Sequence, residues 1–376
     1  MKILLLDSIN KNTLAIARHL GIMDQFEIHV AFHTFFSVAN FSKYIHKKHK
    51  LCNPKNTEAY QLLLIDLLKK EKFDLVIPVG FNSYKACAEI QEQIKQYSDV
   101  IITSNENIVI ASNKALTYQL AEKLLVPCPK TYYLKQEAEV HQLNLNYPVV
   151  IKGPFEAGKN IITYANNKSE LVDGFFNMIR KHDFRIPYLP LIQEFISGKG
   201  FGFFAYYDNG ICKRIFMHER IREYPAKGGA SVCAQSYFDE QLMAYGKQML
   251  DHLQWNGVAM VEFKKDDKDG IFKLMEINPK FWGSLDLALC AGVHFPYYLI
   301  QQHLQEKLTY SEKFKNIRFQ WLLNGELFHF LQRPSSFLKI ISDLRKSNND
   351  IWLKDFKPTV FQLFYILAFY LKKWKG

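Results

Sequence analysis

The chain has 376 residues, of which 48% are hydrophobic and 15% aromatic; this composition excludes intrinsic disorder and leaves room for two or three domains with sizeable cores. Its formal net charge is +11, and most of the excess lies between Lys313 and Gly376, where 12 Lys and Arg stand against four Asp and Glu. Six scattered cysteines without a CxxC pair argue against a zinc site and a disulfide framework. The first residues lack the basic leader and cleavage site of a secretory signal, so we expect a cytoplasmic protein.

The first hundred residues alternate between apolar strands and helices, which predicts a parallel sheet covered by helices on both faces. Strands are expected at residues 1–7, 26–32, 74–80 and 100–103, and helices at residues 12–20, 57–72 and 89–97. No GxGxxG follows the first strand, so the fingerprint of a dinucleotide-binding domain is absent. This domain is therefore expected to be a scaffold.

The next segment places a lysine at the end of a buried strand. A helix capped by asparagine is predicted over residues 113–125, and the apolar strand 147–152 ends on Lys152. An ammonium group in such a place needs an anion, so Lys152 is a candidate anion-binding residue. The loop 153–160, which includes Gly158, could fold over phosphates with its backbone N–H groups, although an ordinary hairpin is favoured for the loop taken alone.

Residues 189–202 read as an apolar strand that breaks at a hinge. The strand ends in Gln193 and Glu194, and the three glycines that follow at positions 198, 200 and 202 are expected to loosen the chain. Exposed backbone groups at such a hinge can bind the edge of an adenine ring, and a carboxylate can accept hydrogen bonds from ribose hydroxyls. Gln193 and Glu194 are therefore candidate nucleotide-binding residues.

Residues 218–231 are expected to form a mobile cationic loop. They contain two arginines, a lysine and two adjacent glycines: Arg220, Arg222, Lys227, Gly228 and Gly229. Backbone donors beside cationic side chains suit the capture of a carboxylate or a phosphate. The two-residue spacing of the arginines in an extended loop predicts that both lie on one side. A solvated run of charges is the alternative.

A hairpin with acidic residues is predicted between residues 257 and 284. Two apolar runs, 258–263 and 271–277, flank a polar turn, and each carries a carboxylate, Glu262 in the first and Glu276 in the second. Alternation places Glu276 and Asn278 on the same face. Mg2+ prefers oxygen ligands of this kind beside substrate phosphates, so the three residues are a candidate metal site. The alternative is a pair of carboxylates neutralised by Lys264, Lys265 or Lys280.

The C-terminal region carries no recognisable catalytic motif. Helices are expected at residues 321–332, 334–344 and 358–373, and the last of these contains an uncharged run of twelve residues, 360–371, which is too short to span a bilayer. Aromatic residues beside Lys372, Lys373 and Lys375 could lie at a membrane interface, and a helix docked on the protein core is an equally good explanation. No nucleic-acid recognition module accompanies the positive charge, so no nucleic-acid partner is expected.

Taken together and in order, these motifs resemble the ATP-grasp superfamily. They are NKALT, VVIKG, the glycine-containing loop, QEFISG, the arginine–GG segment, VEF and MEINPKFWGS. The chain looks most like the carbamoyl-phosphate-synthase-like and amino-acid-ligase branch. The resemblance implies an N-terminal α/β domain (residues 1–110), an ATP-grasp lobe with the glycine loop (111–190), a lobe with the metal site (191–305) and a basic, aromatic helical region (306–376).

The resemblance also implies roles for individual residues. ATP would contact Lys114, Lys152, Gly158, Gln193 and Glu194, and Mg2+ (or Mn2+) would be held by Glu262, Glu276 and Asn278. The substrate would meet Lys227, Gly228, Gly229 and Ser284. Catalysis would use Arg220, Arg222 and Lys280. Lys280 stands where family members usually carry an arginine, and lysine keeps the charge without the bidentate fork.

The function that follows is an ATP-dependent carboxylate–amine ligase that forms an amide bond through an acyl phosphate. The carboxylate could belong to an amino acid, a peptide or a cell-surface glycan. One alternative is a ligase that uses ammonia or another nucleophile, and another is a non-catalytic nucleotide-binding or membrane-peripheral protein. The expected partners are small carboxylates and amines, together with a peripheral membrane contact through the C-terminus. A homodimer is compatible with the sequence.

Overall fold

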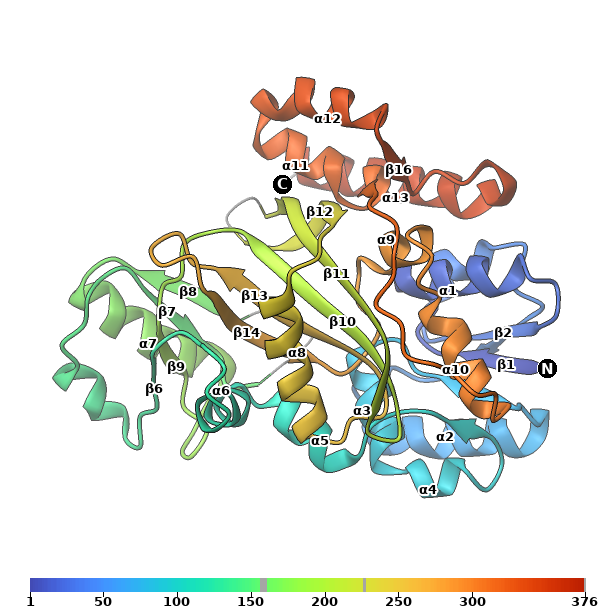
Figure 1. The fold of residues 1–376 in the computed structure, drawn as a ribbon, viewed down its shortest axis with the longest axis horizontal. Coiled ribbons are helices and arrows are strands. Elements are labelled where there is room, and N and C mark those ends of the chain that lie inside the picture. Colours follow the sequence, from blue (N-terminus) through green and yellow to red (C-terminus); the bar gives the residue numbers. More distant parts are fainter. Residues whose placement is uncertain (156–160, 226–227, 375–376) are drawn as a thin grey trace.

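The computed structural model describes residues 1–155, 161–225 and 228–374, and it contains three sheets and a C-terminal helical cap (Figure 1). The parallel sheet of the N-terminal domain lies on one side of the molecule. A small antiparallel sheet lies on the opposite side, and a larger, mainly antiparallel sheet lies between them. The fold class expected from the sequence is therefore confirmed.

The N-terminal sheet has the strand order β3-β2-β1-β4-β5, with every pair parallel. Its strands are β1 (Lys2–Leu5), β2 (Glu27–Phe32), β3 (Lys47–Lys50), β4 (Leu75–Ile77) and β5 (Asp99–Val100). Its helices are α1 (Lys11–Gly21), α2 (Thr57–Glu71), α3 (Phe81–Glu89), α4 (Gln91–Ile94) and α5 (Asn105–Ser112). Alternate residues of β1 enter two cores, because Ile3 packs with α1 whereas Leu4 packs with α2.

The small lobe contains the antiparallel sheet β6-β9-β7-β8 and two helices. Its elements are α6 (Lys114–Lys123), β6 (Thr131–Tyr132), β7 (Val149–Lys152), β8 (Ile162–Ala165), α7 (Lys168–His182) and β9 (Leu191–Glu194). Asn113 caps α6, since its side chain accepts hydrogen bonds from the backbone of Ala115 and Leu116, as the sequence predicts. Leu171 and Phe175 of α7, one turn apart, pack on Ile151 of β7.

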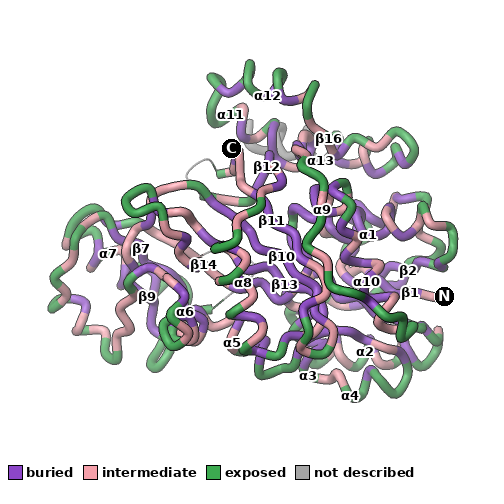
Figure 2. Tube along the Cα trace, viewed as in Figure 1, coloured by how far each residue is buried: buried purple, intermediate pink, exposed green. Residues whose placement is uncertain are grey.

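The large sheet has the strand order β14-β13-β10-β11-β12-β15-β16. Its strands are β10 (Gly200–Asp208), β11 (Ile211–Tyr224), β12 (Ala230–Ser236), β13 (Gly257–Lys265), β14 (Phe272–Asn278), β15 (Arg318–Gln320) and β16 (Ser347–Asn349). Among the helices that pack on it are α8 (Glu240–His252), α9 (Leu285–Cys290) and α10 (Phe295–His303). Phe203 faces α8, and Phe204 faces the core shared with the N-terminal domain. Its central strands are accordingly buried (Figure 2).

Three glycines that were expected to loosen the chain instead permit close packing. Gly200 and Gly202 are buried within β10, and a Cβ atom at Gly202 would overlap the ring of Phe204. Gly198 has φ of +120°, and a Cβ there would overlap the carbonyl oxygen of Lys265. The expectation of a loose hinge is therefore wrong, because this segment packs directly against β13.

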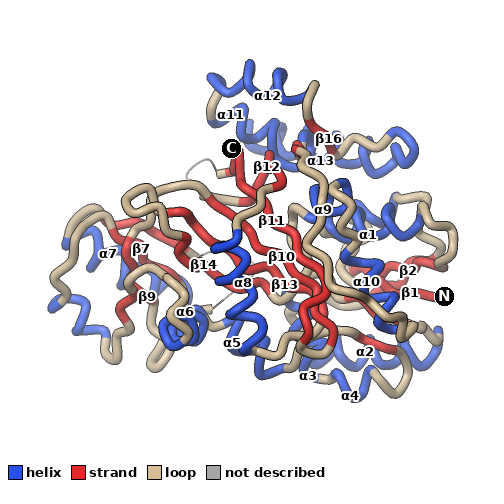
Figure 3. The backbone as a smooth tube through the Cα atoms, in the orientation of Figure 1, coloured by secondary structure: helices blue, strands red, loops and turns tan. Residues whose placement is uncertain are grey.

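The C-terminal cap combines helices with two strands of the large sheet (Figure 3). Its helices are α11 (Leu327–Gln332), α12 (Phe337–Leu344) and α13 (Phe356–Trp374). The helix expected from residue 321 begins only at Leu327, because residues 322–326 form an irregular turn. The cap is tied to the N-terminal domain by Asp355, whose carboxylate accepts hydrogen bonds from Arg18 (2.9 Å) and Ser42 (2.8 Å). Within the described part of the chain, no helix is long and apolar enough to cross a bilayer.

Gly198→Ala tests the packing of this segment, with Gly270→Ala as its matched control. Both glycines have positive φ, but an added Cβ at Gly270 meets nothing within 4 Å. We expect Gly270→Ala to lower the free energy of unfolding by about 1–2 kcal/mol through backbone strain. Gly198→Ala should lower it by about 1–3 kcal/mol more, because the new methyl group overlaps backbone atoms. Urea unfolding measures both values, and equal losses would contradict the packing described here.

Candidate active site

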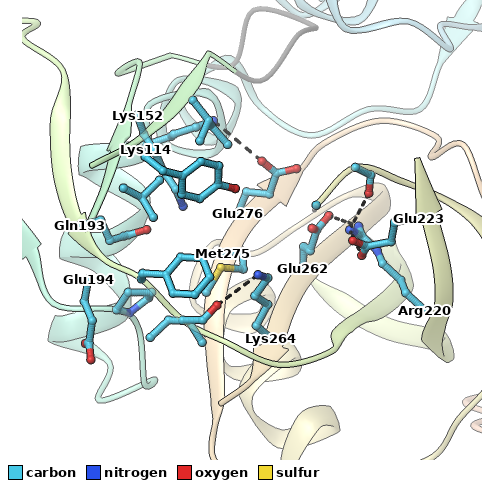
Figure 4. Close-up of a pocket in the computed structure, with 18 residues that line it drawn as sticks. Lys114, Lys152, Gln193, Glu194, Arg220, Glu223, Glu262, Lys264, Met275 and Glu276 are labelled. Atoms are coloured by element: carbon cyan, nitrogen blue, oxygen red, sulfur yellow. Dashed lines mark hydrogen bonds and ion pairs between the residues drawn. The ribbon is translucent and has the colours of Figure 1, made fainter. Parts of the chain in front are cut away.

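An open cavity lies between the small lobe and the large sheet. Its walls come from α6, β7 and β9 on one side and from β11, β13 and β14 on the other. Figure 4 shows Lys114 and Lys152 approaching from the small lobe toward Glu276, with Glu262 and Arg220 farther along the large sheet. Four residues expected to bind a nucleotide thus share one cavity with two of the expected metal ligands, Glu262 and Glu276, whereas Asn278 lines a neighbouring cavity.

The acidic hairpin forms as the sequence predicts. Antiparallel pairing of β13 with β14 places Glu262 directly opposite Glu276, and Asn278 donates a hydrogen bond of 2.8 Å from Nδ2 to Oε1 of Glu276. Two carboxylates and an amide oxygen therefore lie together on one face of the sheet. This donor set fits a hard divalent cation such as Mg2+, which takes oxygen ligands. The metal-binding role of the three residues stays a prediction.

The electrostatics of the two carboxylates differ. Burial raises the pKa of Glu262, and the negative charge of Glu276 raises it further, while Arg220 opposes both effects. Burial alone would also raise the pKa of Glu276, but Lys114, Asn278 and Lys280 together hold it below its ordinary value. The site thus keeps Glu276 charged and makes the negative charge of Glu262 unfavourable. A bound cation would remove that unfavourable energy.

The small lobe places two lysines beside these carboxylates. The Nζ atom of Lys114 lies 3.8 Å from Oε2 of Glu276. Burial lowers the pKa of Lys152 to about 8, and the charge of Lys114 lowers it in the same direction, against the attraction of Glu276 and Glu262. Lys152 donates a hydrogen bond of 3.0 Å to the hydroxyl of Tyr118, which itself donates to the backbone oxygen of Met275 at 2.6 Å. Tyr118 is not among the site residues predicted from the sequence, although it lies one helical turn after Lys114.

The far end of the cavity is formed by the end of β9. The side chain of Gln193 is buried and donates to Thr131 Oγ1 at 2.8 Å, so its amide is held within the small lobe. Glu194 is 42% exposed, with Lys268 Nζ 3.8 Å from its carboxylate. Phe195 and Ile196 also line this end, and Lys264 donates to the backbone oxygen of Ile196 at 3.2 Å. These contacts were also missed, because an apolar strand end followed by glycine gives no sign of which side chain turns inward.

Arg220 and Arg222 lie in different environments, which corrects the expectation that both face one side. Arg220 faces the cavity, with its guanidinium 2.5 Å from Glu262, 3.2 Å from Glu223 and 3.1 Å from the backbone oxygen of Gly229. The pairing of β11 with β12 shifts between the two arginines, so an extra residue on β11 interrupts the two-residue period. Period-2 reasoning failed because of this bulge.

Arg222 is buried among acidic residues of the C-terminal cap. Its guanidinium contacts Glu326 at 2.5 Å and Asp343 at 2.6 Å, and Arg318 also pairs with Asp343. Burial by itself would lower the pKa of Arg222, but these carboxylates raise it above its ordinary value. The contacts explain Arg222 as a residue that joins β11 to the cap.

The predicted cationic loop is mostly a pair of strands. Residues 218–224 belong to β11, and Ala230 and Ser231 begin β12, so the expectation of a mobile loop over 218–231 is wrong. The connection between the strands brings Gly228 and Gly229 to the cavity wall. Lys227 and Gly158, both predicted site residues, lie outside the described residues.

A second open cavity adjoins the acidic pair. Glu262, Glu276 and Arg220 line both cavities, whereas Lys280 and Ser284 line the second. The carboxylates therefore stand where the two spaces meet. A group bound among the lysines of the first cavity could react across this boundary with a molecule held beside Arg220 and Lys280 in the second.

Arg222→Ala tests whether this arginine is structural. The substitution leaves the buried Glu326 without its cation, so we expect the free energy of unfolding to fall by about 3–5 kcal/mol. The control is Arg185→Ala, which removes an ion pair whose side chains are 80% and 77% exposed, and should change stability by at most about 1 kcal/mol. Similar urea midpoints for the two variants would show that the buried pairs contribute little.

Comparisons with known proteins agree with this arrangement. A family model described as "ATP-grasp in the biosynthetic pathway with Ter operon" matches residues 216–324, which include β12 to β15 and the acidic hairpin. The chain is 23% identical over 300 residues to a D-aspartate ligase of Enterococcus faecium (strain Aus0004), and the match covers 74% of this chain and 71% of that protein.

Solved structures show the same fold at low sequence identity. A biotin carboxylase from Campylobacter jejuni, in a β,γ-ATP complex, matches with a TM-score of 0.70 and 15% identity over 84% of this chain and 74% of its own. An L-amino acid ligase from Bacillus licheniformis matches with a TM-score of 0.64 and 13% identity, over 82% and 75% of the two chains. The family match over residues 216–324, the shared fold and the cleft between two lobes agree, and in each of these the chain is similar to ATP-grasp proteins.

Proposed function

We propose that this protein is an ATP-dependent ligase that joins a carboxylate to an amine. The observation that carries the proposal is the acidic pair Glu262 and Glu276, which stands between a lysine-lined cavity and a second cavity containing Arg220 and Lys280. The similarity to a D-aspartate ligase and the shared fold of an L-amino acid ligase support an amino acid as one substrate.

ATP is proposed to occupy the first cavity. Its phosphates would meet the ammonium groups of Lys114 and Lys152, and its ribose hydroxyls would meet the half-exposed carboxylate of Glu194. The side chain of Gln193 is held by its hydrogen bond to Thr131, so it would form one wall of the adenine pocket. Glu262, Glu276 and Asn278 would hold Mg2+ or Mn2+, and the bound ion would neutralise charge on the transferred phosphoryl group.

The reaction would proceed in two balanced steps. A carboxylate oxygen of the substrate attacks the γ-phosphorus of ATP, the bond from that phosphorus to the bridging oxygen breaks, and ADP leaves. The amine nitrogen then attacks the acyl carbon, inorganic phosphate leaves, and the nitrogen loses a proton. Arg220 would orient the carboxylate, since its guanidinium faces both cavities. Lys280 would supply positive charge to the acyl phosphate without a bidentate contact.

A release assay tests the proposal. ADP and phosphate are measured with a panel of L- and D-amino acids as carboxylate donors, with and without an amine, and hydroxylamine is added to trap an acyl phosphate as a hydroxamate. We expect hydroxamate only with ATP, a divalent cation and an accepted amino acid. Carboxylate-independent ATP hydrolysis, or ATP binding without turnover, would contradict the ligase and favour a non-catalytic nucleotide-binding protein.

Glu276→Gln should lower hydroxamate formation by about 10- to 100-fold, the value of one charge-assisted contact or more. The fold should be retained, because the substitution also removes repulsion between two half-buried carboxylates. The control is Glu219→Gln, which changes a carboxylate on β11 whose partner is the exposed Lys199. Turnover that stays normal in Glu276→Gln, with the same dependence on Mg2+, would remove Glu276 from the metal site.

Tyr118→Phe tests how Lys152 is held. The loss of one hydrogen bond to the ammonium group should weaken ATP by about 2- to 10-fold, with a smaller effect on adenosine. Calorimetric titration of both ligands measures the difference. Tyr245→Phe is the control, because its hydroxyl accepts a hydrogen bond only from Gln241 among the contacts described for it, on the exposed side of α8. Equal losses for adenosine and ATP would show that Tyr118 acts through the adenine pocket instead.

A further inference from the structure

Exposed apolar side chains are concentrated on the C-terminal cap. Of the 28 large apolar side chains that are exposed in the described chain, 11 fall between residues 327 and 364. Helix α12 exposes Phe337, Leu338 and Ile341, and α11 and the segment before α13 add others. Isolated apolar residues on a surface are ordinary, whereas a concentration of this kind marks an interaction surface.

The exposed apolar residues of helix α13 lie along one face of the helix and form a stripe. Phe361 stacks on Phe41 of the N-terminal domain at 4.6 Å, and Ile366 is buried on the same side. On the opposite side Phe356, Val360, Leu363 and Phe364 are exposed, at the i, i+4, i+7, i+8 spacing of one helical face. The helix is therefore already docked by one face and presents a second apolar face outward.

The charges around this stripe all have one sign. The acidic residues of the cap are buried and bonded inside it: Glu326, Asp343, Asp350 and Asp355. Its basic residues are exposed: Arg333, Lys339, Arg345, Lys346, Lys354 and Lys357. The cap thus offers apolar groups and positive charge together, and no exposed negative charge among its described residues.

We propose that α13 and the surrounding cap form a docking surface for an anionic lipid bilayer, with α13 lying in the membrane interface. An apolar stripe flanked by lysines suits the boundary between acyl chains and anionic headgroups. A second copy of the chain is disfavoured as the occupant, because two such surfaces would bring like charges together. The helix would lie along the membrane and not cross it. The inference is independent of the proposed ligase activity.

Vesicle flotation of the full chain tests the surface. The probes are vesicles of phosphatidylcholine alone and vesicles that also contain phosphatidylglycerol, each at low and high NaCl. We expect binding to the anionic vesicles only, and weaker binding at high salt because exposed charges are screened. The double variant Lys354→Gln/Lys357→Gln should bind more weakly by about fivefold per lysine.

The double variant Leu363→Gln/Phe364→Gln should lose vesicle binding while keeping its thermal unfolding midpoint, since both side chains are exposed. Leu62→Gln, on the exposed face of α2 and 70% exposed, is the matched control and should bind as the unchanged chain does. Sedimentation of the same proteins without vesicles shows whether a second copy of the chain occupies the surface instead of lipid. Absence of vesicle binding, or a dimer that only Leu363→Gln/Phe364→Gln dissolves, would overturn the proposal, as would equal binding to neutral vesicles.

Discussion

Glu262 and Glu276 lie directly opposite each other on one antiparallel pair of strands, and this crowding of half-buried negative charge constrains the rest of the site. Ions that leave water must find partners, and here the partners come from separate parts of the chain: Lys114 from α6, Arg220 from β11 and Lys280 from the segment after β14. Cationic groups from three elements thus converge on one hairpin. The same charged side chains therefore contribute both to the folding of the site and to its chemistry.

The two lobes contribute to that arrangement in different ways. The large sheet holds its acidic residues by strand register, so their positions depend on backbone pairing that extends across several strands. The small lobe instead reaches the acidic pair with long side chains, and Tyr118 fixes one of them by bonding both to Lys152 and to the backbone of β14. An acidic platform held by strand register is thus matched by two buried cationic groups from the small lobe, an arrangement suited to a ligand whose charge changes during a reaction.

Sequence patterns predicted the parts of this structure that follow a simple period. The parallel N-terminal sheet formed as expected because strands alternate with helices along the chain, and the acidic hairpin formed because two apolar runs flank an Asp/Gly turn. Prediction failed where a local irregularity changed the period. The bulge in β11 turns Arg222 toward Glu326, and the glycines near residue 200 serve packing that only the tertiary structure reveals. Tyr118 was missed because its role depends on contacts with two other elements.

The way in which the cap joins the large sheet has a consequence for modularity. Strand β15 pairs with β12, and β16 pairs with β15, so the last part of the chain covers what would otherwise be an open sheet edge. A chain shortened before β15 would expose the unpaired backbone groups of β12, and open edges invite pairing between molecules. It would also strip the counterions from Arg222. The two lobes therefore depend on the cap for their folding. A shortened chain would self-associate before its enzymatic activity could be measured.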